Sequence, residues 1–267
     1  MMPVFSSKAL AGEHALITGA TGGIGYETAK VLADMGASLT ITGRNEEKLE
    51  LLKEELQKTH PAIQVFHYKA DIGLEQDRQQ LVSHAERTLG PISLLVNNAG
   101  ILGGGIVEEL IQEEMEKVMH INYTSTVLLT QLVYRTMKSL QKGAVVNVAS
   151  LSGLRGTYAN TAYAASKFAL IGFTHSFAVE AIRYGVRVNA VCPGFVDTKM
   201  GRQSLKKNAA LRGQTFEEFL KNTEQNIPSG RITTPLEVAH TIAFLLTDAA
   251  ANIIGESVKI SGGHLLR

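Results

Sequence analysis

The sequence predicts a single α/β domain built on a doubly wound, seven-stranded parallel sheet. Seven short, near-continuous apolar runs rich in β-branched residues alternate with longer helical patterns. No Pro-, Gly- or Ser-rich linker and no internal repeat divides the 267 residues. Such runs suit strands buried on both faces, and right-handed crossovers between them produce a doubly wound sheet. Because ligands of such sheets bind beyond the carboxyl ends of the strands, we expect the functional residues there.

The strands are expected at the seven apolar runs, with helices between them. Their ranges are 14–18, 38–42, 63–70, 93–98, 144–150, 186–191 and 256–260. A long helix is expected from about 107 to 140. Residues 199–227 depart from the alternation, because they are polar and hold no strand pattern, although FEEFL within them favours an amphipathic helical turn. Since this segment lies between a strand end and the next helix, we predict that it is a lid.

Composition excludes several classes of function. The formal net charge is +1, from 26 basic and 25 acidic residues without a long basic tract, so nucleic acid is not an expected partner. Cys192 is the only cysteine, which rules out an intramolecular disulfide and a cysteine-type metal site. The opening MMPVFSSKALAGEH lacks the apolar core of a signal peptide, and no apolar run approaches the length of a membrane span. We therefore expect a soluble, cytoplasmic protein with no metal and no membrane contact.

The first strand ends in TGATGGIG, residues 18–25, which opens a helical pattern. Its glycines Gly19, Gly23 and Gly25 let the backbone turn tightly and approach a pyrophosphate, which the amides at a helix N-terminus can bind. The spacing is GxxxGxG and not the usual GxGxxG, so a purely structural loop stays open as an alternative.

The next two strand ends add to the evidence for a dinucleotide. The second runs into TGRNEEK, where Arg44 stands beside Gly43 instead of the acidic residue typical of an NAD site. An arginine can bind a 2′-phosphate, so NADP(H) is favoured over NAD(H). Alternatively, Arg44 only balances Glu46 and Glu47 in solvent. Asp71, after the third strand, is interpreted either as an acceptor for an adenine amine or as a helix cap.

Three of the seven tyrosines head a YxxxK match, which places tyrosine and lysine on one helix face. Tyr26 and Tyr134 lie inside helical patterns away from any strand end that supplies partners, so we interpret them as packing or surface residues. Tyr163 differs, because a strand ends at Ser150, thirteen residues earlier, and the loop between them can bring both hydroxyls to one pocket.

The Tyr163 pattern suggests carbonyl chemistry. A free tyrosine, with a pKa near 10, is a poor acid or base at neutral pH unless its phenolate is stabilised, and Lys167 one turn away can do so. Ser150 can hold a carbonyl oxygen while Tyr163 gives it a proton and a nicotinamide delivers hydride to the carbon. Ser152 is an alternative to Ser150 as the active hydroxyl.

Six motifs in this order resemble the short-chain dehydrogenase/reductase family over nearly the whole chain. They are TGATGGIG, NNAG at 97–100, Asn122 in HINYTS, Ser150, YAASK at 163–167 and PGFVDT at 193–198. The resemblance implies a Rossmann-like fold with Tyr163 as acid and base, Lys167 lowering its pKa and binding the nicotinamide ribose, and Ser150 orienting the substrate. It also implies that Asn122 holds a proton-relay water, although a helix cap or kink is its alternative role.

The resemblance further implies which residues bind the dinucleotide. They are Gly19, Thr21, Gly23, Ile24, Gly25, Arg44, Asp71, Ile72, Asn98, Ala99, Gly100, Tyr163, Lys167, Pro193, Gly194, Val196 and Thr198. Asn97 is expected to tie strands together, and Cys192 is interpreted as buried apolar volume. NADP-binding members often carry a basic residue where this chain has Gly22, so the cofactor preference depends on Arg44 and on the missing acid at position 43.

The carboxyl-terminal third resembles the 3-oxoacyl-thioester reductases of fatty acid synthesis and the related polyketide ketoreductases. A 3-oxoacyl thioester is therefore the expected substrate, and another carbonyl or alcohol (polyketide, sugar or steroid) is the alternative. A non-catalytic nucleotide sensor is disfavoured, because simple binding needs no tyrosine paired with lysine. An acyl carrier protein would need a basic patch, for which the candidates are Arg155, Arg202, Lys206, Lys207 and Arg212. The resemblance also implies a homotetramer built by the long fourth and fifth helices and the last strand.

Overall fold

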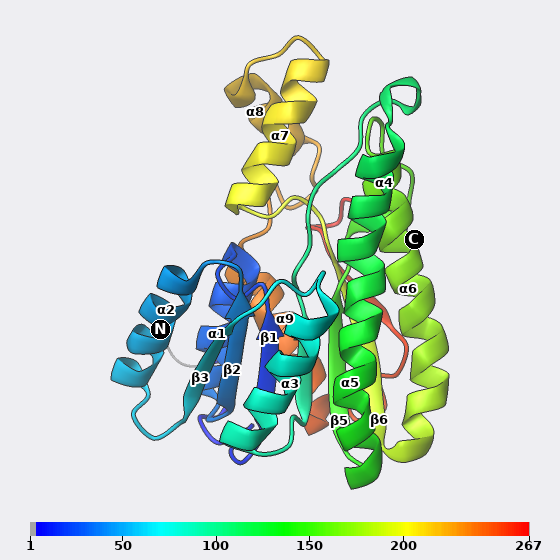
Figure 1. Cartoon of the computed structure of the whole chain (residues 1–267). Coiled ribbons are helices and arrows are strands. Elements are labelled where there is room, and N and C mark those ends of the chain that lie inside the picture. Colours follow the sequence, from blue (N-terminus) through cyan, green and yellow to red (C-terminus); the bar gives the residue numbers. More distant parts are fainter. Residues whose placement is uncertain (1–3, 267) are drawn as a thin grey trace.

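Seven parallel strands form one sheet in the order β3-β2-β1-β4-β5-β6-β7, as the computed structural model of residues 4–266 shows (Figure 1). Residues 1–3, part of the N-terminal stretch considered above, and residue 267 lie outside the described residues. The strands are β1 (His14–Thr18), β2 (Ser38–Gly43), β3 (Val65–Lys69), β4 (Leu94–Asn97), β5 (Gly143–Val148), β6 (Val186–Pro193) and β7 (Ser257–Ile260). Each predicted strand is present, and the predicted doubly wound, Rossmann-like fold is confirmed.

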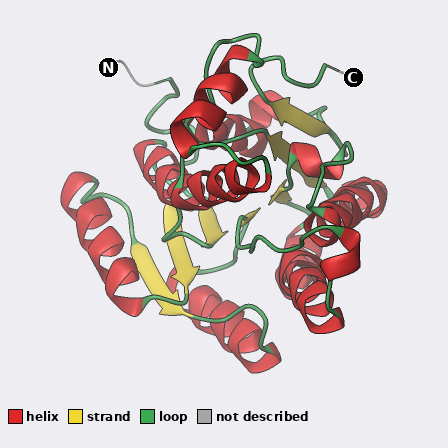
Figure 2. Cartoon of the chain, turned by 90° about the horizontal axis from the view of Figure 1, so that it is seen from above, coloured by secondary structure: helices red, strands yellow, loops and turns green. Residues whose placement is uncertain are grey.

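Helices cover both faces of this sheet (Figure 2). One face packs on α1 (Gly23–Asp34), α2 (Glu46–Thr59) and α9 (Pro235–Leu246), and the other on α3 (Glu75–Leu89), α5 (Ser125–Leu140) and α6 (Thr161–Ala181). In β1, Ala15 and Ile17 join the first core and Leu16 joins the second. All three are fully buried, which explains why the strand reads as a continuous apolar run.

The strand order reverses between β1 and β4, so the loops after these two strands diverge at the carboxyl edge of the sheet. Asn98, just after β4, holds the loop after β1, because its side-chain amide donates to the backbone oxygens of Thr18 (3.1 Å) and Gly19 (3.0 Å). Asn97 donates to Thr130 and to Asn147 of β5, at 2.9 Å each, and thus ties strands together as expected.

The long helix expected from 107 to 140 is interrupted, so that prediction is wrong in detail. A 3₁₀ turn at Val107–Glu109 is followed by two extended residues, by α4 (Gln112–Met119), by a π-helical turn at His120–Thr124 and only then by α5. The π turn contains Asn122, whose tertiary hydrogen bonds, described below, are not visible in the sequence pattern.

The predicted lid consists of two helices, α7 (Lys199–Leu211) and α8 (Phe216–Gln225), which stand above the carboxyl edge of the sheet (Figure 1). Thr198 caps α7 and Thr215 caps α8 with a capping box. The helices bury their own small core of Leu205, Ala209 and Phe219. The segment holds no strand, as predicted, and FEEFL lies within α8.

The longest helix between residues 4 and 266 is α6, with 21 residues. Neither it nor any other helix in this range has the length and apolar character needed to cross a membrane.

Candidate active site

A cavity of about 550 Å³ opens at the carboxyl edge of the sheet, below the lid. Its wall combines the loops after β1 to β6 with α7 and the segment after β7. The predicted site residues that line it are Gly19, Thr21, Gly23, Ile24, Arg44, Asp71, Ile72, Asn98, Ala99, Gly100, Ser150, Tyr163, Lys167, Pro193, Gly194, Val196 and Thr198. Two predicted site residues, Gly25 and Asn122, do not line the cavity.

The glycine loop presents an open helix N-terminus to the cavity. Helix α1 begins at Gly23 after Gly22, which has no side chain to cap it, so the first amides of the helix lack a capping acceptor. Gly19 has a φ of +64°, and a Cβ on Gly23 would lie 2.6 Å from the Thr198 methyl. The uncapped amides of α1 face a space that stays free only because Gly23 has no side chain. Such amides and such a space suit the binding of a pyrophosphate. Gly25 serves packing, since its Cβ would lie 2.3 Å from the backbone oxygen of Gly19.

Arg44 and Lys48 line the end of the cavity beyond β2, and both are exposed. Neither forms an ion pair with any residue between 4 and 266. Glu46 instead lies 2.9 Å from the Nε2 of His67, so the structure shows no pairing of Arg44 with Glu46. Lys48 was missed in the sequence, although its position four residues after Arg44, in the first turn of α2, was a usable signal. Two cations at this end suit a phosphate.

Asp71 does not cap a helix. Its Oδ1 accepts from the amide of Gly73 at 2.9 Å in a tight turn, and α3 begins only at Glu75, after Leu74, without a side-chain cap. The capping alternative is therefore not what the structure shows, and Asp71 remains a cavity residue beside Ile72.

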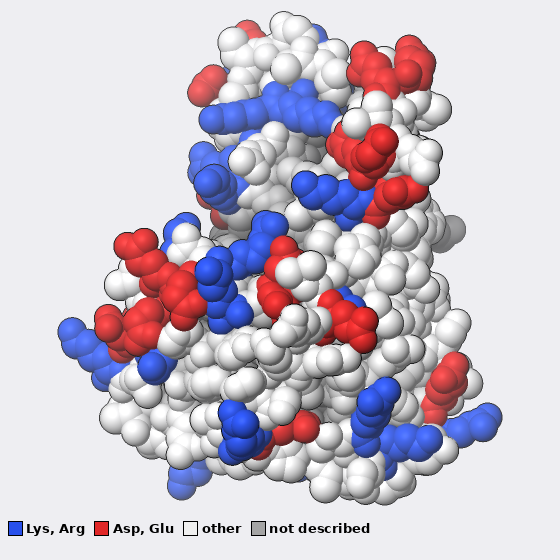
Figure 3. Space-filling view, in the orientation of Figure 1, with Lys and Arg blue, Asp and Glu red and all other residues white. Residues whose placement is uncertain are grey.

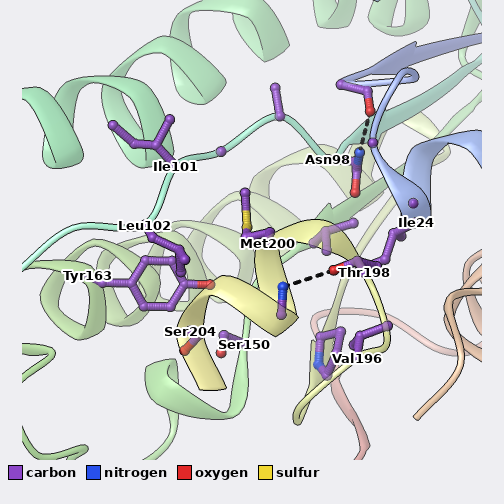
Figure 4. A pocket seen from close by; sticks show the side chains of 18 of the residues that line it. Ile24, Asn98, Ile101, Leu102, Ser150, Tyr163, Val196, Thr198, Met200 and Ser204 are labelled. Carbon is purple, nitrogen blue, oxygen red and sulfur yellow. Dashed lines mark hydrogen bonds between the residues drawn. The ribbon is translucent and has the colours of Figure 1, made fainter. Parts of the chain in front are cut away.

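Ser150, Tyr163 and Lys167 converge in the cavity from the end of β5 and the start of α6. The Tyr163 hydroxyl and the Ser150 side chain point into the same space (Figure 4). Ser150 Oγ also accepts from the amide of Ser152 at 3.1 Å, which fixes its position. Lys167 is buried, donates to the backbone oxygen of Val148 at 2.9 Å and places Nζ 5.7 Å from the centre of the Tyr163 ring.

Burial dominates the ionisation of this pair. It raises the pKa of Tyr163 to about 12, against the opposing effect of the Ser150 hydrogen bond, and lowers the pKa of Lys167 to about 8. The expectation that Lys167 lowers the pKa of Tyr163 is not met here, because the loss of hydration is the largest contribution and raises that pKa. Tyr163 is thus a protonated donor at neutral pH.

Asn122 sits in the π turn and is buried. Its Oδ1 accepts from the amide of Ile101 at 2.8 Å, and its Nδ2 donates to the Ile101 oxygen and to Ser166 Oγ, both at 3.0 Å. The side chain thus ties the loop after β4 to α6. The relay-water role of Asn122 and its alternative of a helix kink both stay predictions.

The other two YxxxK matches are packing features. Tyr26 donates to Glu55, which also pairs with Lys30 at 3.1 Å. Tyr134 packs edge-on against Phe177, with ring centres 4.9 Å apart. Neither tyrosine lines the cavity.

The lid and the chain end supply cavity residues that the sequence did not predict. Met200 and Ser204 of α7 line the same cavity as Tyr163 (Figure 4), and their spacing of four within the predicted lid was a usable signal. His264, after β7, also lines the cavity, where no sequence pattern pointed to it. Cys192 is fully buried in a core cluster, as interpreted, and burial raises the pKa of its thiol to about 11.

The five candidate residues for a carrier patch are not equivalent. Arg202 is paired with a carboxylate five residues before it, and Lys207 donates to a backbone oxygen of the loop after β4. Lys206 and Arg212 lie over aromatic rings of the lid. Basic side chains nevertheless flank the hollow below the lid (Figure 3). Arg155 lies apart from the other four, in the cavity wall.

Comparison with known proteins agrees with this geometry. The family model for short chain dehydrogenase matches residues 13–209. The 3-oxoacyl-[acyl-carrier-protein] reductase of Mus musculus is 36% identical over 247 residues, which cover 92% of this chain and 95% of that protein. A solved structure of a single-residue variant of actinorhodin polyketide ketoreductase with NADPH has a TM-score of 0.91 at 33% identity, covering 94% of this chain and 97% of that one. NAD⁺-bound xylitol dehydrogenase also has a TM-score of 0.91, at 29% identity, and covers 95% of this chain and 99% of that one.

Proposed function

Because this chain belongs to the short-chain dehydrogenase family, we propose that it is an NADP(H)-dependent reductase that converts the ketone of a 3-oxoacyl thioester to a secondary alcohol. The enzyme is an oxidoreductase that acts on CH–OH and ketone groups. The observation that carries the proposal is the convergence of Ser150, Tyr163 and Lys167 in one cavity, beside the open N-terminus of α1.

Each of these side chains has a defined task in the proposed reaction. Ser150 binds the carbonyl oxygen of the substrate, and the protonated Tyr163 hydroxyl gives its proton to that oxygen. A reduced nicotinamide, when bound, supplies the hydride for the carbonyl carbon. Lys167, held by the Val148 oxygen, stabilises the Tyr163 phenolate left behind and binds the nicotinamide ribose.

The preference for NADP(H) is supported by Arg44 and Lys48, two cations at the end of the cavity beyond β2 that pair with no carboxylate in residues 4–266. A 2′-phosphate fits such a pair through charge-assisted hydrogen bonds. The related actinorhodin ketoreductase was solved with NADPH, whereas xylitol dehydrogenase was solved with NAD⁺. The distinction between the cofactors therefore depends on this chain's own residues.

The thioester substrate is supported by the mouse relative, which acts on 3-oxoacyl groups on an acyl carrier protein, and the ketoreductase neighbour favours a polyketide as second candidate. A carrier protein is the proposed partner, because α7 bears Lys199, Arg202, Lys206 and Lys207 and no acidic residue. A homotetramer is also proposed, on the basis of an exposed stripe along α6 that is discussed below.

The direct test is NADPH consumption by the purified enzyme with acetoacetyl-CoA. Tyr163→Phe should lower kcat by about 10²- to 10⁴-fold, the usual contribution of a positioned acid, and leave the Kd for NADPH unchanged. Tyr134→Phe and Tyr26→Phe are matched controls in the other two YxxxK sequences and should keep near-normal rates. Equal losses in all three variants would contradict the assignment of Tyr163.

A further inference from the structure

Arg155 is a cation in the cavity wall with an unusual set of contacts. Its Nη2 donates to the Nε2 of His264 at 3.2 Å, and both side chains line the cavity that holds Ser150 and Tyr163. The Nε of Arg155 is buried and has no hydrogen-bond partner within residues 4–266. No ion pair of Arg155 occurs in this range either.

Other arginines of the chain show which partners a guanidinium group has in this fold. Arg202 and Arg231 are exposed and paired with carboxylates. The buried Arg187 donates to four backbone oxygens at 2.6–3.3 Å. A guanidinium stays protonated, and withdrawing it from water without compensation costs free energy. Half-buried Arg155, which in residues 4–266 bonds through its side chain only to an imidazole, lacks this compensation.

His264 does not supply a negative charge, and it presents a further donor. Burial and the neighbouring Arg155 charge lower the pKa of His264, so the ring is neutral at neutral pH. Arginine only donates, so Nε2 must accept and the remaining ring proton lies on Nδ1. The pair therefore offers hydrogen-bond donors and a net positive charge.

The position of the pair relates it to the substrate. Arg155 follows Ser150 by five residues across a 3₁₀ turn, and its amide bonds the Leu151 oxygen at 3.2 Å. At about 2 Å per residue, the two Cα atoms lie within roughly 10 Å of each other. Asp71, the only carboxylate that the described residues place in the cavity wall, follows β3 at the far edge of the sheet and is not a partner for Arg155.

We propose that Arg155 and His264 form a subsite for an oxyanion of the substrate, a carboxylate or a phosphate, in the cavity that holds Ser150 and Tyr163. This inference rests on the proposed function, since it takes the cavity as the place where a ketone is reduced. A free 3-oxo acid would supply a carboxylate, and the pantetheine arm of a thioester would supply a phosphate. Either group would complete the hydrogen bonds of the guanidinium with charge-assisted contacts.

Paired substrates that share one ketone test the subsite. Acetoacetate is compared with its neutral ethyl ester, and acetoacetyl-CoA with the neutral N-acetylcysteamine thioester. For Arg155→Gln we expect the KM of an anionic substrate to rise by about ten- to hundredfold, the range of a charged hydrogen bond, with little change for its neutral counterpart. An effect on acetoacetate alone identifies a carboxylate, and an effect on acetoacetyl-CoA alone identifies a phosphate.

Controls separate the subsite from structural effects. Arg183→Gln alters an exposed arginine just before the amino end of β6. The cavity lies at the carboxyl ends of the strands, so this change should leave every KM unchanged. Arg155→Lys, which keeps the charge, should recover part of the affinity. Equal rises in KM for charged and neutral substrates, no rise at all, or a weakened Kd for NADPH in Arg155→Gln would each overturn the proposal.

A binding measurement distinguishes failure of this proposal from failure of the proposed function. Calorimetric titration of Tyr163→Phe with acetoacetate and with acetoacetyl-CoA reports binding without turnover. If the wild-type enzyme reduces none of the four substrates but Arg155→Gln in this background still weakens binding of an anion tenfold, the proposed function fails and the subsite stands. If Arg155→Gln leaves the binding of both anions unchanged, the subsite is excluded whatever the activity.

Discussion

Three cations of the cavity lie in different electrostatic surroundings, and this difference assigns them different tasks. Lys167 is buried and held by the Val148 oxygen, so burial lowers its pKa to about 8. Arg155 is half-buried beside His264. Arg44 is exposed at the other end of the cavity and forms no ion pair within residues 4–266. Arg44 is therefore the cation that we propose distinguishes a 2′-phosphate from a 2′-hydroxyl.

At the residue scale, we predict that Arg44→Asp shifts the cofactor preference from NADPH towards NADH. The carboxylate would repel a 2′-phosphate and could accept from ribose hydroxyls, so kcat/KM for NADPH should fall by about ten- to hundredfold. Steady-state kinetics with both cofactors measure the ratio. Arg87→Asp, on the exposed last turn of α3, is the control for a general charge effect. An unchanged ratio in Arg44→Asp would count against a phosphate contact.

At the element scale, the π turn at His120–Thr124 contains a buried polar side chain that holds a loop of the cavity. The Asn122 amide makes three hydrogen bonds, two of them to the backbone of Ile101. A Cβ on Gly100 would lie 3.2 Å from the Asn122 oxygen and 3.7 Å from Lys167 Nζ, so this loop passes closely between the two side chains. π turns are often found at functional sites, and this one positions a wall of the cavity.

We predict that Asn122→Ala lowers the free energy of unfolding by on the order of 1–3 kcal/mol, because it leaves the part-buried backbone groups of Ile101 without partners. Urea denaturation measures the change. Asn252→Ala, at an exposed position, should stay within about 0.5 kcal/mol of the wild type. If both variants are equally stable, the amide does not hold the loop.

At the scale of the whole molecule, α6 bears an exposed stripe that lacks charge. Its residues recur at spacings of three and four and are Thr161, Ala165, Phe168, Gly172, His175 and Val179. Phe168 and Val179 are 47% and 64% exposed. Helices that are apolar on every face are usually buried against a partner, which supports the proposed homotetramer.

Gly172→Arg tests this assembly. A Cβ at Gly172 meets nothing within 4 Å, so the isolated chain accepts a side chain there, whereas a charge facing a partner helix would disfavour association. Light scattering coupled to size-exclusion chromatography should show assemblies smaller than four 28.8 kDa chains for this variant and a tetramer for the wild type. Ser83→Arg, exposed on α3, should stay tetrameric. A tetrameric Gly172→Arg protein would exclude this face.

The sequence by itself determined the seven strands, the place of the strand-free segment 199–227 and, among the predicted site residues, all but two of those that should line one cavity. Strand patterns such as HALIT can be recognised locally, because the apolar character of each residue indicates whether that position is buried. In a parallel sheet the strand ends share one edge, so motifs at Gly19, Ser150 and Pro193 had to meet there.

Only the tertiary structure decided the remaining features, because they depend on residues distant in the chain. The Arg155–His264 contact joins positions 109 apart, and Asn122 of the π turn accepts a hydrogen bond from Ile101, 21 residues away. The high pKa of Tyr163 likewise reflects burial by the whole fold and not its spacing from Lys167. Local sequence patterns carry no information on such contacts. The packing of the whole chain sets both the distance between two side chains and the access of water to them.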